Sequence, residues 1–383
     1  MWFLQVDILL LMLACAVVVS AALRVSDKFG VRSKVQNLIP LVDLGVIAYV
    51  SVELAVFYAL YTVATYGLVR LALFAKGKAG TLVFGVGSLL CMAPLVYSRL
   101  AEDFSALPMG PIVLVGIAYN MLKAIDALYY AHYAEQRIPF FTYANYMLFF
   151  PVITAGPVFR YRDFEHAWPA PSRVGIDDVT YAVKRMVSGL FMKVVLSSLV
   201  ASLLQTMVAA EPKAWISLLV PLVSLVVLFF DMAGYASIAI GMGALMGVKV
   251  PENFKKPWQA ASFTQFWRKW HVTVSDWIRE HVFVLVSGKK LTKWHSAALS
   301  FVVMVVMSLW HDFSVLFVID GACLGLLLAA ENVLGLTTVP RRANKAYVRA
   351  RAFVVNYLFA INTMLFTLST DQIASVLGGL FCL

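Results

Sequence analysis

Long blocks of apolar residues, separated by short polar segments, dominate this chain. Most blocks hold about 20 residues or more, which is the length that a helix needs to cross the hydrocarbon core of a bilayer. The candidate spans are residues 2–23, 38–75, 80–98, 109–131, 141–159, 187–210, 215–248, 296–311, 313–334 and 351–370. The blocks 38–75 and 215–248 are too long for one simple crossing, so we expect each to hold two shorter or tilted helices. We therefore predict an all-α integral membrane protein with about nine to eleven transmembrane helices.

The segment 249–295 interrupts this pattern, because it is too polar to span a membrane and yet rich in aromatic residues. It holds five of the nine tryptophans, and tryptophan prefers the water–lipid interface. Ser262 and Gln265 form a capping-box pattern, which predicts the start of a helix. Four residues then share one face of that helix: Trp267, Trp270, His271 and Val274. The pattern predicts an interfacial or re-entrant helix with His271 on its buried side, and a peripheral helix with an incidental histidine is the alternative.

The composition supports a membrane protein and changes the meaning of the positive charge. Hydrophobic residues make up 61% of the chain and charged residues 14%, with a mean hydropathy of +0.82. A soluble domain has about half apolar and about a quarter charged residues. The net charge of +10 fits Lys and Arg in short cytoplasmic loops, since no basic run alternates with polar sequence as a nucleic-acid surface requires. We expect no nucleic-acid partner.

Further features exclude several other classes. The four cysteines are scattered and show no zinc-ligand spacing, so we predict no metal site. The first apolar run, 2–23, lacks a basic n-region and a clear small-residue cleavage site, which favours a retained transmembrane helix over a signal peptide. No internal repeat is visible, which weighs against a transporter built from duplicated halves.

Two histidines that follow tryptophans are the strongest candidates for chemistry, His271 and His311. Histidine accepts and returns a proton near neutral pH. Transfer of an acyl group to a hydroxyl needs a base for the alcohol and a donor for the carbonyl oxygen, and the two histidines can divide these tasks. A histidine that merely ends a helix is the alternative for His311.

Other polar residues are candidates for supporting roles. Asp231 lies inside an apolar block, where a carboxylate is usually paired or lines a wet cavity, so a functional and a purely structural role both remain open. Arg160 and Arg162 follow a helix-breaking Gly156-Pro157 pair. Their guanidinium groups suit anionic lipid headgroups, or a phosphorylated donor, and the lipid interpretation is favoured.

Taken together, these segments resemble the membrane-bound O-acyltransferase (MBOAT) family, and in particular its bacterial AlgI- and DltB-like branch. The matching stretches are Phe149-Phe150-Pro151, Ala155-Gly156-Pro157, Arg160-Tyr161-Arg162-Asp163-Phe164, Asp231 with Gly234-Tyr235, Ala239-Ile240-Gly241, Pro251-Glu252-Asn253-Phe254, Phe266-Trp267-Arg268-Lys269-Trp270-His271, Ser275-Asp276-Trp277-Ile278-Arg279 and Leu309-Trp310-His311. They occur in family order and cover roughly residues 110–325, within a single predicted domain of 1–383.

The resemblance implies a ring of tilted helices around a central tunnel that joins the two membrane faces. It identifies His311 as the catalytic residue and His271 as essential. We expect His311 to act as general base and His271 to position the reactants or stabilise the oxyanion. The residues expected to line or support the tunnel are Asp231, Trp267, Arg268, Ser275 and Trp310. No bound cofactor is expected, because the acyl donor, an acyl-CoA or an acyl-carrier-protein thioester, is a substrate.

The implied function is transfer of a small acyl group, acetyl or D-alanyl, from a cytoplasmic donor across the membrane. The acceptor would be a hydroxyl of a cell-envelope polysaccharide, a teichoic acid or a partner protein. The expected partners are the lipid bilayer, a membrane-anchored periplasmic or extracellular transfer protein and a cytoplasmic acyl-carrier protein. The expected location is the bacterial cytoplasmic (inner) membrane, with multiple passes. The alternative is a proton-coupled transporter or flippase of envelope intermediates.

The chain departs from the family pattern at two places. Asp312 stands where the family usually has glycine after the second Trp-His pair. A nearby carboxylate favours the imidazolium form of a histidine, so Asp312 is expected to alter the basicity of His311. A histidine common further downstream in the family is absent from the segment 321–325. A catalytically inactive scaffold therefore remains a third interpretation.

Overall fold

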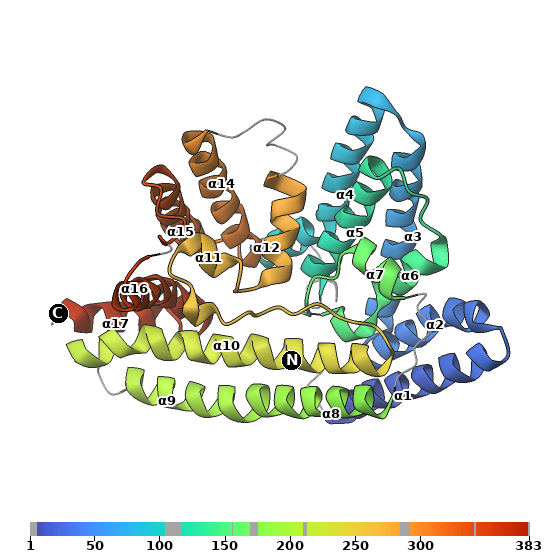
Figure 1. The fold of residues 1–383 in the computed structure, drawn as a ribbon, viewed down its shortest axis with the longest axis horizontal. Helices are drawn as coiled ribbons and strands as arrows, with labels where there is room; N and C mark the ends of the chain where they lie inside the picture. Colours follow the sequence, from blue (N-terminus) through green and yellow to red (C-terminus); the bar gives the residue numbers. More distant parts are fainter. Residues whose placement is uncertain are drawn as a thin grey trace. The chain divides into compact units, whose positions relative to one another are not determined.

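All regular elements in the described part of the chain are helices (Figure 1). The computed structural model describes residues 6–103, 116–154, 156–168, 175–209, 213–283, 292–340 and 342–381. This result confirms the predicted all-α class. The chain forms two compact units, one of residues 1–186 with 237–251 and the other of residues 187–236 with 252–383.

Seven of the described helical segments are long and apolar enough to cross a membrane. These segments are Asp7–Lys28, Val52–Phe74, Gly77–Leu100, Ile176–Ala209, Ala214–Leu245, Lys293–His311 and Val315–Val333. Large apolar side chains such as Leu60, Leu89 and Leu199 are exposed on them. A helix that faces lipid requires such a surface, because hydrocarbon offers no partner for polar groups.

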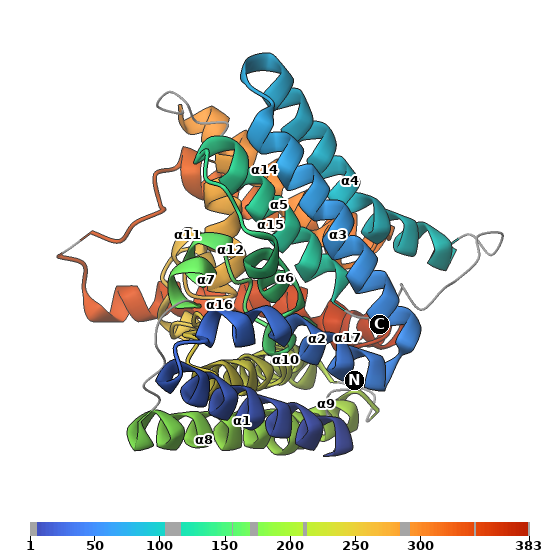
Figure 2. The same cartoon turned by 90° about the vertical axis from the view of Figure 1, so that its right-hand side faces the viewer.

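The first unit contains the N-terminal helices and three shorter elements. Its elements are α1 (Val6–Lys28), α2 (Arg32–Val50), α3 (Val52–Phe74), α4 (Gly77–Asp103), α5 (Ile117–Tyr133), α6 (Phe140–Leu148), the 3-10 turn η3 (Phe150–Val152), α7 (Tyr161–Ala167) and most of α8 (Ile176–Leu190). Helices α3, α4 and α5 run side by side in Figures 1 and 2, and α1 packs against α2.

The block 38–75 holds two helices, as predicted. Helix α2 ends at Val50, and Ser51 separates it from α3 with an extended backbone. The Ser51 hydroxyl caps α3 by accepting a hydrogen bond from the Leu54 backbone N–H at 3.1 Å. A serine side chain at this position satisfies one of the N–H groups that the first helical turn leaves without a partner.

The predicted span 141–159 is wrong. Helix α6 has only nine residues and ends at Leu148, and the chain then forms the 3-10 turn η3. Pro151 lies in that turn and Pro157 follows it, and proline cannot continue an α-helix because it lacks the N–H donor. In the predicted span 109–131, residues 109–115 lie outside the described residues, and α5 begins at Ile117.

Buried polar groups fasten α5 to the turns that follow it. The Lys123 ammonium donates to the Met147 carbonyl at 2.9 Å, and Asn120 Nδ2 donates to the Ile153 carbonyl at 2.9 Å. The Asp126 carboxylate accepts hydrogen bonds from the Tyr161 backbone N–H and the Tyr146 hydroxyl. These bonds give the buried polar groups of α5 main-chain partners, which a low-dielectric interior requires.

The second unit contains the C-terminal helices. Its elements are the π-helical segment η4 (Phe191–Leu196), α9 (Ser197–Ala209), most of α10 (Ala214–Leu245), η5 (Pro257–Gln259), α11 (Phe263–Trp267), α12 (Val272–Ile278), the π-helical segment η6 (Arg279–Phe283), α14 (Lys293–His311), α15 (Val315–Val333), α16 (Lys345–Thr363), η7 (Met364–Phe366) and α17 (Thr370–Phe381). Helices α14 and α15 pack side by side (Figure 1).

The block 215–248 is one long helix, so the expectation of two helices does not hold here. Helix α10 has 32 residues and continues through Pro221. At 1.5 Å per residue it is about 48 Å long, against a hydrocarbon core of about 30 Å. A helix of this length must tilt or extend beyond the core.

The predicted interfacial helix is broken at its histidine. Ser262 caps α11 as expected, accepting from the Gln265 N–H at 3.1 Å, but α11 ends at Trp267. A new helix, α12, begins after His271, whose φ of +45° is left-handed. The cause is pairing with an upstream segment: Lys255 N–H donates to the Lys269 carbonyl and Val272 N–H donates to the Asn253 carbonyl. These bonds occupy backbone groups that a continuous helix would use.

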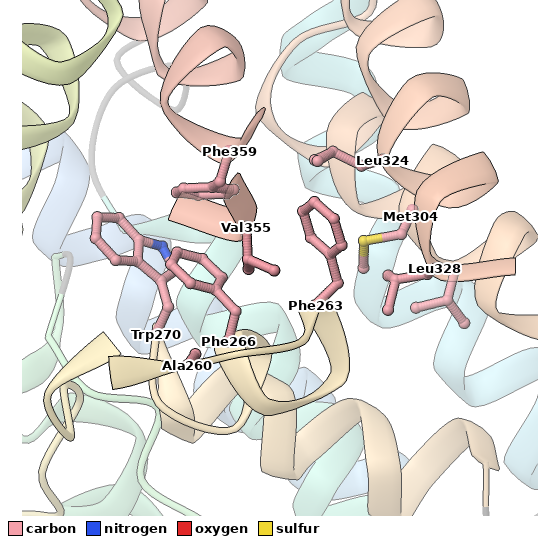
Figure 3. Close-up of a cluster of buried hydrophobic side chains, with 10 residues drawn as sticks. Ala260, Phe263, Phe266, Trp270, Met304, Leu324, Leu328, Val355 and Phe359 are labelled. Carbon is pink, nitrogen blue, oxygen red and sulfur yellow. The ribbon is translucent and has the colours of Figure 1, made fainter. Parts of the chain in front are cut away.

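An aromatic cluster holds the broken segment against three long helices (Figure 3). Phe266 stacks on Trp270 with ring centroids 5.6 Å apart, and its ring lies 4.3 Å from that of Phe359 on α16. Met304 of α14 and Leu324 of α15 belong to the same cluster. Aromatic pairs prefer such offset and tilted arrangements. The cluster therefore fixes the position of the segment that carries His271.

Candidate active site

His271 is buried and held by an asparagine from the upstream segment. Its side chain is 6% exposed, and Nδ1 lies 3.1 Å from the Oδ1 atom of Asn253. The Thr273 hydroxyl donates to the same oxygen at 2.9 Å, and the Thr273 backbone N–H points to it at 3.5 Å. Because an amide oxygen only accepts, Nδ1 carries the proton and donates it, and Nε2 of the neutral ring carries the lone pair.

The surroundings of His271 keep it neutral. Burial, and to a smaller extent the neighbouring His311, lower the pKa of His271 to about 3. Both causes act against the imidazolium form, because a charge is costly in a low-dielectric site and a second positive ring repels it. At neutral pH His271 is therefore a hydrogen-bond acceptor through Nε2.

His311 is the last residue of α14. The helix ends there because Asp312 adopts an extended backbone with φ of −160°. The His311 ring lies between aromatic neighbours: its centroid is 5.1 Å from Trp310 and 5.0 Å from Phe366, which meets it edge to face. The residue itself is exposed. Aromatic packing thus orients a histidine that remains accessible.

Two adjoining cavities in the second unit meet at His271. The larger has a volume of about 290 Å³ and is lined by residues of α11, α12, α14 and α15. The smaller has a volume of about 90 Å³ and contains both histidines in its wall. Four residues line both cavities: Trp267, His271, Met304 and Met307. The structure therefore brings His271 and His311 together, as a linear sequence cannot show.

The larger cavity has apolar walls and cationic groups. Val303, Met304 and Leu328 are among its apolar lining residues, whereas Arg268 and Arg279 supply positive charge. The Arg279 guanidinium also forms an ion pair with Asp276 at 2.8 Å. Of the expected tunnel residues, Trp267, Arg268 and Ser275 lie in this wall. The Trp267 indole N–H is buried and has no hydrogen-bond partner among the described residues.

The smaller cavity contains an acidic residue that the sequence analysis missed. Asp320 of α15 is 8% exposed and lines this cavity with the two histidines. Its Oδ2 atom accepts from the Ser308 hydroxyl at 2.6 Å, and its Oδ1 atom accepts from the Asn362 amide. A carboxylate inside an apolar span is the signal that singled out Asp231, and the same rule applied to 313–334 finds Asp320. The rule does not select Asn253, the hydrogen-bond partner of His271, because Asn253 is uncharged and lies outside the apolar blocks.

The remaining predicted residues lie elsewhere. Asp231 pairs with the Lys193 ammonium of η4, whose side chain is 4% exposed, and Asp231 is not among the described residues that line either cavity. Trp310 contacts the His311 ring and is not among the described residues that line either cavity. In the first unit, Arg160 forms an ion pair with Asp163 at 2.7 Å, and Arg162 lies 3.7 Å from the same carboxylate.

The site combines groups suited to proton transfer. It offers one neutral histidine with a fixed proton, one accessible histidine and one carboxylate around a small cavity. Within the described residues, no cluster of three or more His, Cys, Asp or Glu side chains could hold a metal ion. Two histidines and a carboxylate around one cavity are suited to acid–base chemistry.

Comparison with known proteins decides the family. The sequence model described as MBOAT, membrane-bound O-acyltransferase family, matches residues 6–370. The chain belongs to the membrane-bound O-acyltransferase family. It is therefore a polytopic membrane protein of an O-acyltransferase family, and the family match includes both histidines.

Curated bacterial relatives of this MBOAT chain carry names of three different activities. The probable alginate O-acetylase AlgI of Pseudomonas putida is 29% identical over 236 residues, which is 60% of this chain and 48% of the relative. The teichoic acid D-alanyltransferase of Bacillus subtilis is 28% identical over 241 residues, 59% of this chain and 60% of the relative. The peptidoglycan O-acetyltransferase of Helicobacter pylori is 25% identical over 227 residues, 57% of this chain and 42% of the relative. The chain spans about half the length of the curated relatives that it matches.

Proposed function

We propose that this protein transfers a small acyl group, acetyl or D-alanyl, from a cytoplasmic thioester to a hydroxyl of the bacterial cell envelope. The acceptor is an envelope polysaccharide, a teichoic acid or a partner protein. The observation that carries the proposal is that His271 and His311 line one small cavity, which adjoins a larger apolar one. The names of the relatives, which include acetylases and a D-alanyltransferase, support a small acyl group.

His311 acts as the general base of the transfer. It takes the proton of the acceptor hydroxyl, and the oxygen attacks the thioester carbonyl carbon. The C–S bond then breaks, and the leaving thiolate recovers the proton from the His311 imidazolium. The products are an ester and a thiol, so atoms and charge balance without a further reactant.

His271 positions reactants rather than donating to the oxyanion. Its Nδ1 proton is committed to Asn253, and the lone pair on Nε2 suits acceptance of a hydrogen bond from the acceptor hydroxyl or from His311. The N–H group better placed for the developing oxyanion is the Trp267 indole, which is buried without a partner among the described residues and lines both cavities. A preorganised donor of this kind stabilises charge that appears only in the transition state.

The larger cavity receives the donor. Its apolar wall suits the chain that carries the thioester, and the guanidinium groups of Arg268 and Arg279 suit the phosphate of a coenzyme A or of an acyl-carrier-protein arm. Arg160 and Arg162, in the first unit, serve anionic lipid headgroups. This assignment implies an acyl-carrier protein or acyl-CoA on the cytoplasmic side and a membrane-anchored partner on the outer side of the cytoplasmic membrane.

The test is to release ester-linked groups from cell envelopes with mild base and to identify them by mass spectrometry. Cells would carry the native protein, His311→Ala or the matched control His295→Ala, which removes an exposed histidine from the first turn of the same helix. We expect His311→Ala to lose released acetate or D-alanine and His295→Ala to keep it. Unchanged release from a folded, inserted His311→Ala protein would contradict the proposal and favour a transporter or flippase.

A further inference from the structure

Asp320 is a buried carboxylate whose hydrogen-bond partners among the described residues are neutral. The Ser308 hydroxyl donates to one oxygen and the Asn362 amide donates to the other. These donors come from α14 and α16, so Asp320 of α15 ties three helices together. Both carboxylate oxygens accept a hydrogen bond, and such donors favour the ionised form against the cost of burial. Packing alone would explain this arrangement if Asp320 did not also line a cavity.

The geometry places Asp320 near His311. Ser308 and His311 lie three residues apart on α14, and side chains with this spacing have Cβ atoms about 5–6 Å apart on the same face. Asp320 Oδ2 is 2.6 Å from the Ser308 hydroxyl oxygen. Both Asp320 and His311 line the smaller cavity. The carboxylate and the imidazole therefore share one small cavity, in which a charge on one is weakly screened from the other.

A second buried carboxylate on α15 provides the comparison. Glu331 is 7% exposed and accepts hydrogen bonds from the Phe263 N–H at 2.7 Å and from the Thr264 N–H at 2.9 Å. Glu331 thus stabilises the N-terminus of α11, and it is not among the described residues that line either cavity. The same helix holds one carboxylate that serves a helix end and another that faces the two histidines.

We propose that Asp320 is a positioning residue that stabilises the protonated form of His311 during acyl transfer. The inference rests on the proposed function, in which His311 removes the hydroxyl proton. An imidazolium formed beside apolar residues such as Leu228, Leu324 and Phe359 needs a compensating negative charge. Asp320 is the carboxylate among the described residues that line this cavity.

Asp320 does not exchange a proton in this scheme. The proton moves from the acceptor hydroxyl to His311 and then to the leaving thiolate, while Asp320 remains an acceptor for Ser308 and Asn362. Among the described residues, the titratable groups that line the cavity are His271, His311 and Asp320, and Asp312 follows His311 at the end of α14. His271 is neutral and Asp312 lies outside the cavity lining, so Asp320 supplies the charge inside it.

The experiment measures transfer in membrane vesicles from cells that make the protein. The donors are [14C]acetyl-coenzyme A and a D-[14C]alanyl carrier-protein thioester, and base-labile label is counted from pH 5 to 9. The variants are Asp320→Asn, which removes the charge and preserves the shape, and Glu331→Gln as the matched control. His311→Ala tests the proposed function separately.

We expect Asp320→Asn to lower the maximal rate about 10- to 100-fold. We also expect it to move the acid limb of the pH–rate profile to lower pH by about one unit, because the protonated base loses its partner. Glu331→Gln should lower the thermal stability and leave the shape of the profile unchanged. A folding defect would lower the rate by the same factor at every pH. A shift of the acid limb would therefore indicate loss of charge stabilisation rather than loss of folded protein.

Three results would overturn the inference and leave the proposed function intact. A fully folded Asp320→Asn protein with the native rate and profile would exclude the charge role. A lower rate with an unshifted pH–rate profile would show that Asp320 acts only through helix packing. A loss confined to the D-alanyl donor would assign Asp320 to recognition of the substrate ammonium group. If the native protein transfers label and His311→Ala transfers it equally well, the proposed function fails, and the inference fails with it.

Discussion

Two buried polar regions of this protein look alike in sequence and differ in what they do. In the first unit, Lys123 and Asp126 of α5 are almost fully buried and bond to main-chain groups of neighbouring turns. In the second unit, His271 and Asp320 are buried to a similar extent and face a cavity. A rule that counts polar residues in apolar segments selects both regions. The two regions differ because the polar residues of the second unit border a cavity, which a substrate group can enter.

The largest effect should come from the residue that the second region presents to substrate. We expect His311→Ala to lower the transfer rate about 10²- to 10⁴-fold, because the general base is lost. The thermal stability should change little, since His311 is exposed at a helix end. Transfer of labelled acetyl groups in vesicles, together with a melting curve of the purified protein, measures both quantities.

The opposite pattern is expected in the first region. Asp126→Ala leaves the Tyr161 N–H and the Tyr146 hydroxyl without this acceptor, which should cost about 1–3 kcal/mol of stability. The transfer rate per folded molecule should remain at the native value, because Asp126 fastens α5 to α6 and α7 and is not among the described residues that line either cavity. A melting curve combined with a rate normalised to folded protein checks this. A strongly reduced normalised rate at native stability would erase the distinction between the two regions.

A smaller loss is expected where the second region depends on a long-range contact. Asn253→Leu removes the acceptor that fixes the His271 proton on Nδ1, and we expect the transfer rate to fall about tenfold. Asn253→Asp keeps an acceptor at this position and adds a charge, so it should raise the pKa of His271 and restore part of the rate near neutral pH. Thr273→Val is the control, because it removes a bond to Asn253 without touching the ring. Equal rates for the Leu and Asp variants would contradict tautomer control.

The smallest effect concerns pH. The pKa of His271 is lowered to about 3 in the folded protein, against 6.5 for the ordinary group, so the unfolded chain binds the proton more readily between these values. The stabilising contribution is therefore complete above pH 6.5 and is lost as the pH falls toward 3. Between pH 6.5 and 5.5 the loss should amount to about 1 kcal/mol. Melting curves of native protein and His271→Gln should converge as the pH falls, and parallel curves would refute this origin.

The features that the sequence predicted are those encoded by local residue patterns or by motifs shared with the family. The all-α class, the break between α2 and α3 and the Ser262 cap follow from apolar periodicity and capping residues. Motif order selected both histidines as candidates, and their catalytic role stays a prediction. Apolar periodicity wrongly predicted a continuous helix through His271. The helix is broken by contacts with a distant segment: Asn253 lies 18 residues upstream of its partner His271, and Lys255 lies 14 residues upstream of its partner Lys269. Periodicity also could not predict that Asp320 and His311 line the same cavity, since the packing of the helices determines which side chains meet there.

The most direct test blocks the place where the two cavities meet. Met307→Trp enlarges a side chain that lines both cavities, and Val302→Trp makes the same change on the exposed face of the same helix. The measurement is the rate of labelled acyl transfer in vesicles, normalised to folded, inserted protein. If transfer takes place between His271 and His311, Met307→Trp should abolish it and Val302→Trp should keep the native rate. Native transfer by a folded Met307→Trp protein would contradict this account.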